Sequence, residues 1–516
     1  MKIAGIDVDL QRLAAPVPIS HGVVAVDDWL ASARVVRDGG GRLLALWGSS
    51  SALGETVSVA YVIADGVLWL ELPVKGEPAT YPDLVSFFPT ASRMQRAVAD
   101  LSGLVADAGK DARPWLAHGA WPADYLPLRH DADPAPALAD AALLDYAFVR
   151  VEGEGVHEIA VGPVHAGVIE PGHFRFSVVG EKVLRLEQRL GYTHKGVEQR
   201  MTQLAPLQAC RLAGRVSGDS TVAYAWAYCM ALESAVGCEI SPRAAALRAL
   251  LLERERIANH LGDLGALGND AAFAFGLAQF SRLREDWLRL SKEVFGHRLM
   301  MDCVVPGGVA REIDSAGIDR LRQQCDAVER EVQLLHTIYD EHAGLQDRFM
   351  NTGFVSPALA AQLGLTGLAG RASAQCWDLR SDHPWPPYDR VQVTMATQRN
   401  GDVAARVAVR FDEVFESMRL IRGVLAELPA GPVQQDVGLP DHRCRGAGWV
   451  EGWRGELFVA LELDGAAGRQ RIRRCHLHDP SWQNWPVLEH AVIGNIVPDF
   501  PLINKSFNLS YSGQDL

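Results

Sequence analysis

The sequence lacks paired cysteines. Its eight cysteines never stand in a C-x-x-C pattern or in another close metal-ligand spacing. This excludes a locally encoded iron–sulfur cluster or structural zinc. Cys444, Cys475, His476 and His478 form a looser candidate zinc set. Because the two histidines alternate along an expected strand, ordinary strand side chains are the favoured interpretation.

The sequence also lacks a long apolar run. Its most apolar stretch, residues 221–232, falls well short of the roughly 20 residues that span a bilayer, and it predicts a buried helix. The N-terminus has no basic start followed by an apolar core, so we expect no secretory signal and reduced thiols.

Positive charge is in the minority, with 50 Lys and Arg against 63 Asp and Glu and a net charge of −13. This sign is wrong for a protein that neutralises phosphates, so nucleic acid is excluded as an expected partner. The sequence contains no G-x-S-x-G, no phosphate-binding G-x-x-x-x-G-K-[ST] and no dinucleotide-binding G-x-G-x-x-G. Hydrolase, nucleoside-triphosphatase and direct NAD-binding functions therefore have no motif to support them.

The pattern along the chain predicts an α+β protein. A small N-terminal α+β domain over residues 1–130 contains a hairpin at 55–74, divided by Asp65-Gly66, and residues 131–147 form a Pro-rich linker. A second domain over 148–516 starts with strands at 157–164 and 173–190, with a turn at Gly180-Glu181. Helical periodicity then predicts a central bundle at about 196–350 and short strands near 448–465. The individual bundle helices are expected at 242–265, 280–296 and 318–342.

Polar residues gather in the stretch 191–220, close to the buried helix. His194, Glu198, Arg215 and Asp219 lie there among glycines that permit close backbone approach. A functional cleft accounts for this density. From the residues alone, an interface or a satisfied polar cluster is the favoured alternative, because structural ion pairs also group charges.

Several ordered stretches resemble the large subunit of membrane-bound, energy-converting nickel–iron hydrogenases and the homologous quinone-site subunit of complex I. The likeness extends in order over about 360 residues. The N-terminal part resembles the small accessory subunit of complex I, so the chain resembles a fusion of the two, as in hydrogenase-4 and formate hydrogenlyase. The stretches are GPVHAGVIEPGHFRF (162–176), GYTHKGVE (191–198), RVSGDS (215–220), LLERERIANHLGDLG (251–265), RLMMDCVVPGGVARE (298–312), RSDHP (380–384), EGWRGE (451–456) and NWPVLEHAVIGNIVPDFPLI (484–503), with 87–104 and 112–129 for the accessory subunit.

One departure from the family pattern decides the expected chemistry. Active members of this family hold nickel and iron by four thiolates, and the matching positions here are Ser217, Ser220, Ser510 and Gly513. Nickel prefers ionised sulfur, and a serine hydroxyl does not ionise at neutral pH. The resemblance therefore implies a degenerate metal site, with no nickel and no iron–sulfur cluster bound by this chain.

The complex I subunit uses the same cavity for the quinone headgroup, next to a histidine and a tyrosine. The resemblance offers His165 and His173 as cofactor-binding candidates, with His173 nearer the expected position, but the tyrosine position is Gly218. Glu198 and Asp219 are the candidate proton-transferring acids, with His173 at the mouth of their cavity as the third candidate catalytic residue, and a raised pKa of the acids would suit this transfer. The alternative is that both are ion-paired to Arg215 or Arg380 and hold the cavity closed; for the histidines it is a plain loop role.

The resemblance implies a subunit of a membrane-associated, ion-translocating oxidoreductase complex, in which electron transfer, with quinone as a candidate acceptor, drives proton or cation movement. The implied partners are an iron–sulfur small subunit and an integral membrane arm with antiporter-like subunits, and NADH would be handled elsewhere in the assembly. The implied location is peripheral, on the cytoplasmic face of the inner (plasma) membrane. A non-redox scaffold that couples to the antiporter-like subunits is the alternative function.

Overall fold

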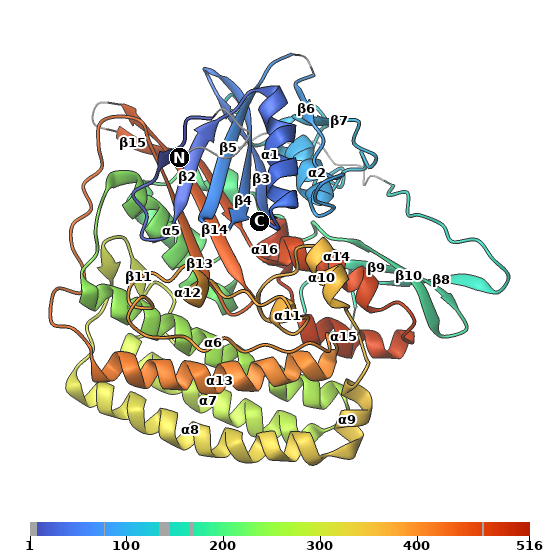
Figure 1. Ribbon diagram of the computed structural model, residues 1–516, viewed down its shortest axis with the longest axis vertical. Coiled ribbons are helices and arrows are strands. Elements are labelled where there is room, and N and C mark those ends of the chain that lie inside the picture. The colour runs from blue at the N-terminus through green and yellow to red at the C-terminus, as the bar shows by residue number, and fades with distance from the viewer. Residues whose placement is uncertain (1–7, 77, 134–144, 166, 168, 467–468) are drawn as a thin grey trace.

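The fold is described by a computed structural model that covers residues 8–76, 78–133, 145–165, 167, 169–466 and 469–516. Figure 1 shows a mixed α+β molecule with the N-terminal sheet at one end, long parallel-running helices at the other, and a small sheet that projects to one side. This confirms the predicted fold class. The predicted linker at 131–147 lies largely outside the described residues, so that boundary stays a prediction.

The N-terminal part is built on a five-stranded sheet of order β1-β2-β5-β4-β3. The predicted hairpin at 55–74 is confirmed: β4 and β5 are antiparallel, and the turn is closed by Ile63 opposite Gly66, whose φ of 120° favours glycine. Helices α1 (Val26–Asp38) and α2 (Ala91–Ser102) accompany the sheet. The strands here are β1 (Gln11–Arg12), β2 (Ile19–Val23), β3 (Arg42–Ser51), β4 (Gly54–Ile63), β5 (Gly66–Val74), β6 (Thr80–Pro82) and β7 (Val105–Asp107).

Four long helices form a bundle. It lies at the opposite end of the molecule from the N-terminal sheet (Figure 1). The first begins at Pro242, as predicted, and the Ser241 hydroxyl caps it by accepting from the Ala244 amide. The prediction was wrong in confining the bundle to residues 196–350, because its fourth long helix comes from about 50 residues further on. The helices are α6 (Pro242–Asp270), α7 (Ala274–Phe295), α8 (Ser315–Glu341) and α13 (Val403–Ala426).

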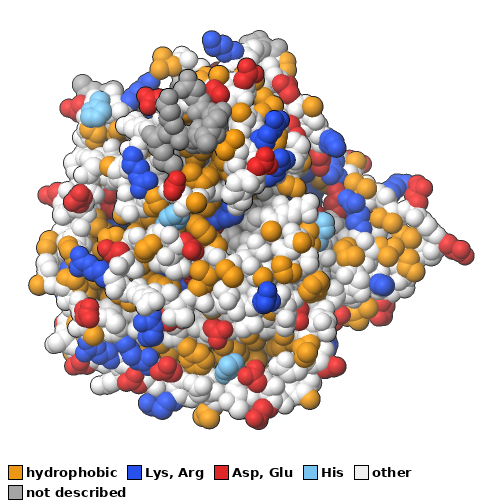
Figure 2. Space-filling view, in the orientation of Figure 1, with side chains coloured by type: hydrophobic (Ala, Val, Ile, Leu, Met, Phe, Trp, Pro, Cys, Tyr) orange, Lys and Arg blue, Asp and Glu red, His pale blue; other side chains and the backbone are white. Residues whose placement is uncertain are grey.

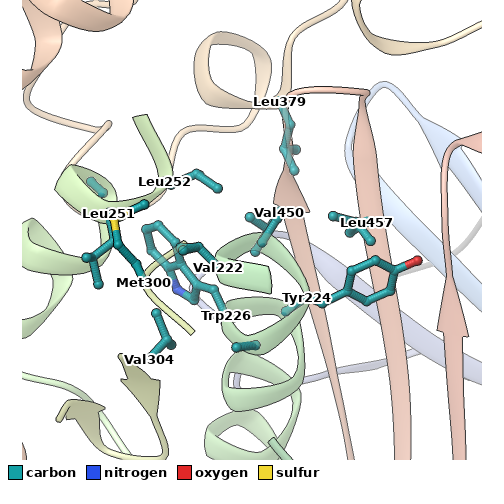
Figure 3. Packing of buried hydrophobic residues seen from close by; sticks show 14 of the residues in the cluster. Val222, Tyr224, Trp226, Leu251, Leu252, Met300, Val304, Leu379, Val450 and Leu457 are labelled. Atoms are coloured by element: carbon teal, nitrogen blue, oxygen red, sulfur yellow. The ribbon is translucent and has the colours of Figure 1, made fainter. Parts of the chain in front are cut away.

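Helix α5 (Thr221–Val236) is the buried helix that the sequence predicted. It packs against strands β13 (Cys444–Glu451) and β14 (Glu456–Ala466). Gly446 and Gly448 make this approach possible, because a Cβ atom at Gly448 would lie 2.0 Å from the Ala227 carbonyl oxygen. Figure 3 shows the Trp226 ring of α5 among Val222, Met300 and other apolar side chains.

The remaining elements complete the second half of the chain. The predicted turn at Gly180 joins β9 to β10 in the projecting sheet, and β13, β14 and β15 form the predicted C-terminal sheet. Among the described residues, no helix is both long enough and apolar enough to cross a membrane. The elements are β8 (Val156–Val161), β9 (His173–Val179), β10 (Lys182–Arg189), α3 (Val197–Met201), α4 (Pro206–Ala213), η1 (Gly218–Ser220), β11 (Val304–Val305), β12 (Gly308–Val309), α9 (Ala343–Phe349), α10 (Pro357–Gln362), α11 (Gly367–Arg371), α12 (Leu379–Asp382), β15 (Arg469–His478), α14 (Ser481–Ala491), η2 (Val497–Asp499), α15 (Phe500–Phe507) and α16 (Tyr511–Asp515).

The N-terminal sheet packs directly on the C-terminal sheet. Trp47 of β3 stacks on His476 of β15 with ring centroids 4.6 Å apart, and Arg474 donates to the Gly48 carbonyl oxygen at 2.8 Å. Arg42 forms an ion pair with the buried Glu456. On the face drawn in Figure 2, acidic and basic side chains are intermixed with apolar ones.

Candidate functional site

The four positions that match the thiolate ligands come together at one buried place, as the resemblance implied. The Ser217 and Ser510 hydroxyl oxygens lie 3.4 Å apart although 293 positions separate them in the chain. The Gly513 amide donates to the Ser510 hydroxyl at 2.9 Å. Ser220 lies on the other side of Asp219, with hydroxyl and carboxylate 3.5 Å apart. Helix α16 and the turn η1 thus meet at this site.

The space between these positions is occupied by an ion pair. Arg454, in the turn between β13 and β14, donates to both carboxylate oxygens of Asp219 at 2.9 and 2.6 Å. The Ser217 hydroxyl also donates to this carboxylate at 2.5 Å, and the Ser220 hydroxyl lies 3.1 Å from Arg454. Two-point contact between guanidinium and carboxylate is the strong form of the ion pair.

The expected partners of Asp219 were wrong. Arg215 instead pairs with Asp302 on the surface at 2.6 Å, and Arg380 pairs with Asp378 and Glu253 in the interior. The reason is geometric. Arg215 is only four residues from Asp219, but its side chain points outward, and the β13–β14 turn brings Arg454 to the acid from a distant segment.

Glu198 is paired as well, on α3 and away from Asp219. Its carboxylate accepts from Arg474 at 2.9 Å, from His476 at 2.8 Å and from the Leu477 amide at 3.1 Å, all on β15. Among the hydrogen bonds and ion pairs of the described residues, none joins Glu198 to Asp219. The two acids therefore belong to separate clusters.

The pKa values of both acids move in the direction opposite to that expected. Burial by itself would raise the pKa of Asp219, but the Arg454 guanidinium and the Ser217 hydroxyl outweigh it and lower the pKa to about 2. For Glu198, Arg474 and His476 likewise outweigh burial and lower the pKa to about 2. The expectation of acids with a raised pKa was wrong, because each acid has a cationic partner from a distant strand.

His173 begins strand β9 and His165 lies in the segment before it. Among the described residues, no hydrogen bond or ion pair joins either histidine to Glu198 or Asp219. The Nδ1 atom of His173 is 3.0 Å from the Gly162 carbonyl oxygen, so this nitrogen carries the hydrogen and Nε2 is left as an acceptor. In His165, Nδ1 accepts from the Gly167 amide at 3.1 Å, so its Nε2 is a donor. Neither buried Nε2 atom has a partner among the described residues. Burial lowers the pKa of His173, which keeps it neutral.

The candidate zinc set is engaged in other contacts. His476 bonds Glu198, and His478 bonds Gln483 at 3.0 Å. In the β13–β14–β15 sheet, Cys444 is paired with Leu463 and Cys475 with Leu461. Within the described part of the chain, no group of three or more His, Cys, Asp and Glu side chains is arranged to hold a metal ion.

A side chain at position 513 has no room in this site. A Cβ atom there would lie 2.5 Å from a carboxylate oxygen of Asp479 and 2.8 Å from the Ser510 hydroxyl. Asp479 is itself fixed, because it accepts from the Tyr224 hydroxyl at 2.7 Å and from the Ser481 amide at 2.8 Å. The residues around the four positions therefore do not fit a four-thiolate metal centre.

The sequence analysis did not identify Glu255 of α6, an acid next to this site. Its buried carboxylate accepts from the Val222 and Ala223 amides at 2.7 and 3.1 Å and so caps the start of α5. Burial raises its pKa to about 8. Asn259 links Glu255 to the site by donating to the Asp219 carbonyl oxygen at 2.7 Å. Both residues lie in the LLERERIANHLGDLG stretch. An acid and an amide one helical turn apart in this stretch could have indicated that they share a face of the helix.

Replacement of Glu255 by glutamine should change how stability depends on pH. The folded chain binds the Glu255 proton more tightly than the unfolded chain does, since its pKa rises from 4.5 to about 8. Its contribution is therefore fully present below pH 4.5 and is lost as the pH rises to about 8. We expect urea denaturation to give a free energy of unfolding that falls over this range by a few kcal/mol more in the wild type than in Glu255→Gln. Parallel curves for the two proteins would contradict the raised pKa.

Two family models match the chain, one in each half. The model for the 49 kDa subunit of respiratory-chain NADH dehydrogenase matches residues 263–441, and that for the 30 kDa subunit matches residues 23–137. A chain of the membrane-bound sulfane sulfur reductase, an archaeal respiratory membrane complex, shares the fold with a TM-score of 0.65 and 23% identity, over 70% of this chain and 99% of that one.

Curated relatives cover most of the sequence. Formate hydrogenlyase subunit 5 of Escherichia coli is 30% identical over 92% of this chain and 85% of its own length. The carbon monoxide-induced hydrogenase of Rhodospirillum rubrum is 31% identical over 68% of this chain and 97% of its own. The C/D fusion protein of the NADH-quinone oxidoreductase of Bacteroides thetaiotaomicron is 28% identical over 81% of this chain and 80% of its own. With the 30 kDa and 49 kDa regions in one chain, this protein belongs to the family of formate hydrogenlyase subunit 5, hydrogenase-4 component G and the C/D fusion proteins of NADH-quinone oxidoreductase.

Proposed function

We propose that this protein is a subunit of a membrane-associated, ion-translocating oxidoreductase complex and that it works without a nickel–iron centre. The proposal rests on the side chains that occupy the place where the related hydrogenases hold their metals. Asp219 and Arg454 pair between the serines, and Asp479 stands against Gly513. The nickel–iron centre of the related hydrogenases is held by ionised sulfur ligands, and these groups supply none. In this chain, the ion pair between Asp219 and Arg454 occupies the place of the metal centre.

Nickel analysis of the purified complex tests this proposal. We expect far less than one nickel atom per chain after dialysis against a chelator, because no thiolate is present to retain the metal. The variant with cysteine at 217, 220, 510 and 513 is expected to remain without nickel too, since Asp479 blocks position 513. Nickel near one atom per chain in the wild type would overturn the proposal.

Quinone is the electron acceptor that we propose, and its headgroup would meet His173 and His165. What supports this is that each of the two imidazoles has a buried Nε2 atom without a partner among the described residues, an acceptor on His173 and a donor on His165. A quinol hydroxyl can donate to the first, and a quinone carbonyl can accept from the second. The neutral state of His173 suits the first of these contacts. The chain's role in this step is to orient the headgroup.

Substitution of His173 by alanine separates this proposal from the scaffold alternative. In an assembled complex, we expect His173→Ala to raise the KM for a water-soluble quinone at least tenfold while iron–sulfur reduction upstream continues. Leu207→Ala, at an exposed site in α4, is the matched control. Unchanged quinone kinetics together with normal ion pumping would favour the non-redox scaffold.

For partners we propose an iron–sulfur small subunit and a membrane arm with antiporter-like subunits. The names of the relatives support a membrane-bound assembly, because they include a membrane-bound reductase complex and NADH-quinone oxidoreductase subunits. We place the chain peripherally, on the cytoplasmic face of the inner (plasma) membrane, where it docks through these partners.

A further inference from the structure

An apolar hollow of about 510 Å³ lies at the C-terminal end of α5, at the far end of this helix from the Asp219 site. We call it the apolar chamber. Its volume lies within the roughly 300–1,000 Å³ of small-molecule sites. Its walls come from α5, α6, α13 and the loop after α12. Its apolar lining residues include Trp226, Met230, Ala245, Ala246, Trp385 and Val424, and charged residues line it as well, namely Glu233, Glu239, Arg248, Arg390 and Glu427.

Two buried polar atoms on the chamber's lining residues have no partner among the described residues. They are the Ser234 hydroxyl and the Trp385 indole nitrogen, in residues that are 5% and 1% exposed. Such orphaned groups cost free energy unless a bound molecule or water satisfies them. The indole N–H can only donate, so an acceptor oxygen in a bound molecule would satisfy it.

A second hollow of about 750 Å³ has more cationic than anionic side chains in its lining; we call it the basic groove. It runs between the N-terminal sheet and the β13–β14–β15 sheet. Ion pairs already engage Arg443, Arg445 and Arg473 with acidic neighbours. Arg12 and Lys75 are exposed and have no ion pair among the described residues. Its charged lining residues are Arg12, Lys75, Arg443, Arg445 and Arg473 against Glu55, Glu71 and Glu462, together with His442.

The chamber and the groove adjoin. Ala14, Ser234 and Gly237 line both hollows, so the unpartnered Ser234 hydroxyl stands at the junction. An apolar space that opens into a cationic one is complementary to a molecule with an apolar chain and an anionic head. An ester oxygen between the acyl chain and the anionic head of such a molecule could accept hydrogen bonds from the buried Ser234 hydroxyl and Trp385 indole N–H.

We propose that these adjoining hollows form a binding site for an anionic acyl amphiphile, with the acyl chain in the apolar chamber and the phosphate or carboxylate head in the basic groove. The site is separate from the Asp219 cluster and does not depend on the redox role of the complex. A lipid of the bilayer and a free monoacyl lipid would present the same acyl chain and anionic head to this site.

Calorimetric titration of the full-length chain with myristoyl lysophosphatidylglycerol, below its critical micelle concentration, tests the proposal. We expect saturable 1:1 binding at least tenfold tighter than that of myristoyl lysophosphatidylcholine, whose head carries no net charge. Arg12→Ala/Lys75→Ala should weaken binding of the anionic lipid about tenfold. The matched variant Lys292→Ala/Arg399→Ala removes two exposed cations elsewhere and should bind as the wild type does.

Variants that fill the apolar chamber test whether the acyl chain of the lipid binds there. Ala246→Phe and Val424→Phe, on two different walls, should each abolish binding of both lipids, with folding checked by circular dichroism. Flotation with phosphatidylglycerol vesicles separates the sources: flotation that is lost in Arg12→Ala/Lys75→Ala indicates a bilayer lipid, and binding without flotation indicates a free amphiphile. Absence of saturable binding, equal affinity for the two lipids, or unchanged binding in a folded chamber-filling variant overturns the proposal. Should both of those variants fail to fold, the groove variant decides alone.

Discussion

Replacement of Arg371 by methionine should leave the chain unable to reach a stable fold. The Arg371 side chain is fully buried and donates to Glu413 at 2.6 Å and to Glu451 at 2.9 Å. Its loss strands these carboxylates in the interior, and removing one partner of a single buried ion pair already costs about 3–5 kcal/mol. Because a domain is stable by only about 5–15 kcal/mol in total, we expect no soluble, cooperatively unfolding protein. Soluble yield and urea denaturation are the measurements.

The same substitution at an exposed pair provides the control. Arg289 bonds Glu285 on the outer surface of α7, with the arginine side chain 69% exposed. Arg289→Met should change the free energy of unfolding by less than about 1 kcal/mol. A well-folded Arg371→Met protein that unfolds at nearly the wild-type urea concentration would contradict the importance of the buried network.

Replacement of Asp219 by asparagine should destabilise the chain by roughly 3 kcal/mol, the lower end of the range for broken buried ion pairs. The reason is the orphaned Arg454, whose side chain is only 6% exposed, whereas that of Asp219 is 33% exposed. Urea denaturation of the two proteins at pH 7 measures the difference. Replacement of both partners, in Asp219→Asn/Arg454→Met, should recover much of the loss because no buried charge is left unpaired.

Activity of the assembled complex separates this structural role from proton transfer. A pKa of about 2 keeps Asp219 ionised at neutral pH, so we expect the Asp219→Asn complex, once assembled, to retain most of its turnover. A complex that is as stable as the wild type but inactive would instead make Asp219 a proton carrier and would contradict the ion-pair interpretation.

Much of the fold could be predicted from local patterns. The 3.6-residue periodicity of α6 and the Asp65-Gly66 turn are local signals, and both features are confirmed. Helix α13 was not predicted, although it completes the bundle. It contains polar residues that are buried in hydrogen bonds and ion pairs, such as Arg406, Arg410 and Glu413, and these obscure an apolar stripe.

The site was predictable in position but not in electrostatics. The resemblance brought Ser217 and Ser510 together correctly, because ligand positions keep their place when the ligand atoms change. The pKa direction of Asp219 was wrong, because the deciding cation is 235 positions away in the sequence. Arg454 lies in the EGWRGE stretch that carried the resemblance, but the sequence did not say which acid it would meet.

The close contact between α5 and β13 has a mechanical consequence. The 16 residues of α5 form a rod about 24 Å long, and Gly446 and Gly448 let a strand backbone lie directly against it without intervening side chains. With no soft layer between them, helix and strand cannot slide independently. One end of this rod begins beside Asp219 and Glu255, and the other carries Glu233 and Ser234. A displacement of α5 at one end is therefore expected to move its other end as well, because the helix moves as one rigid body.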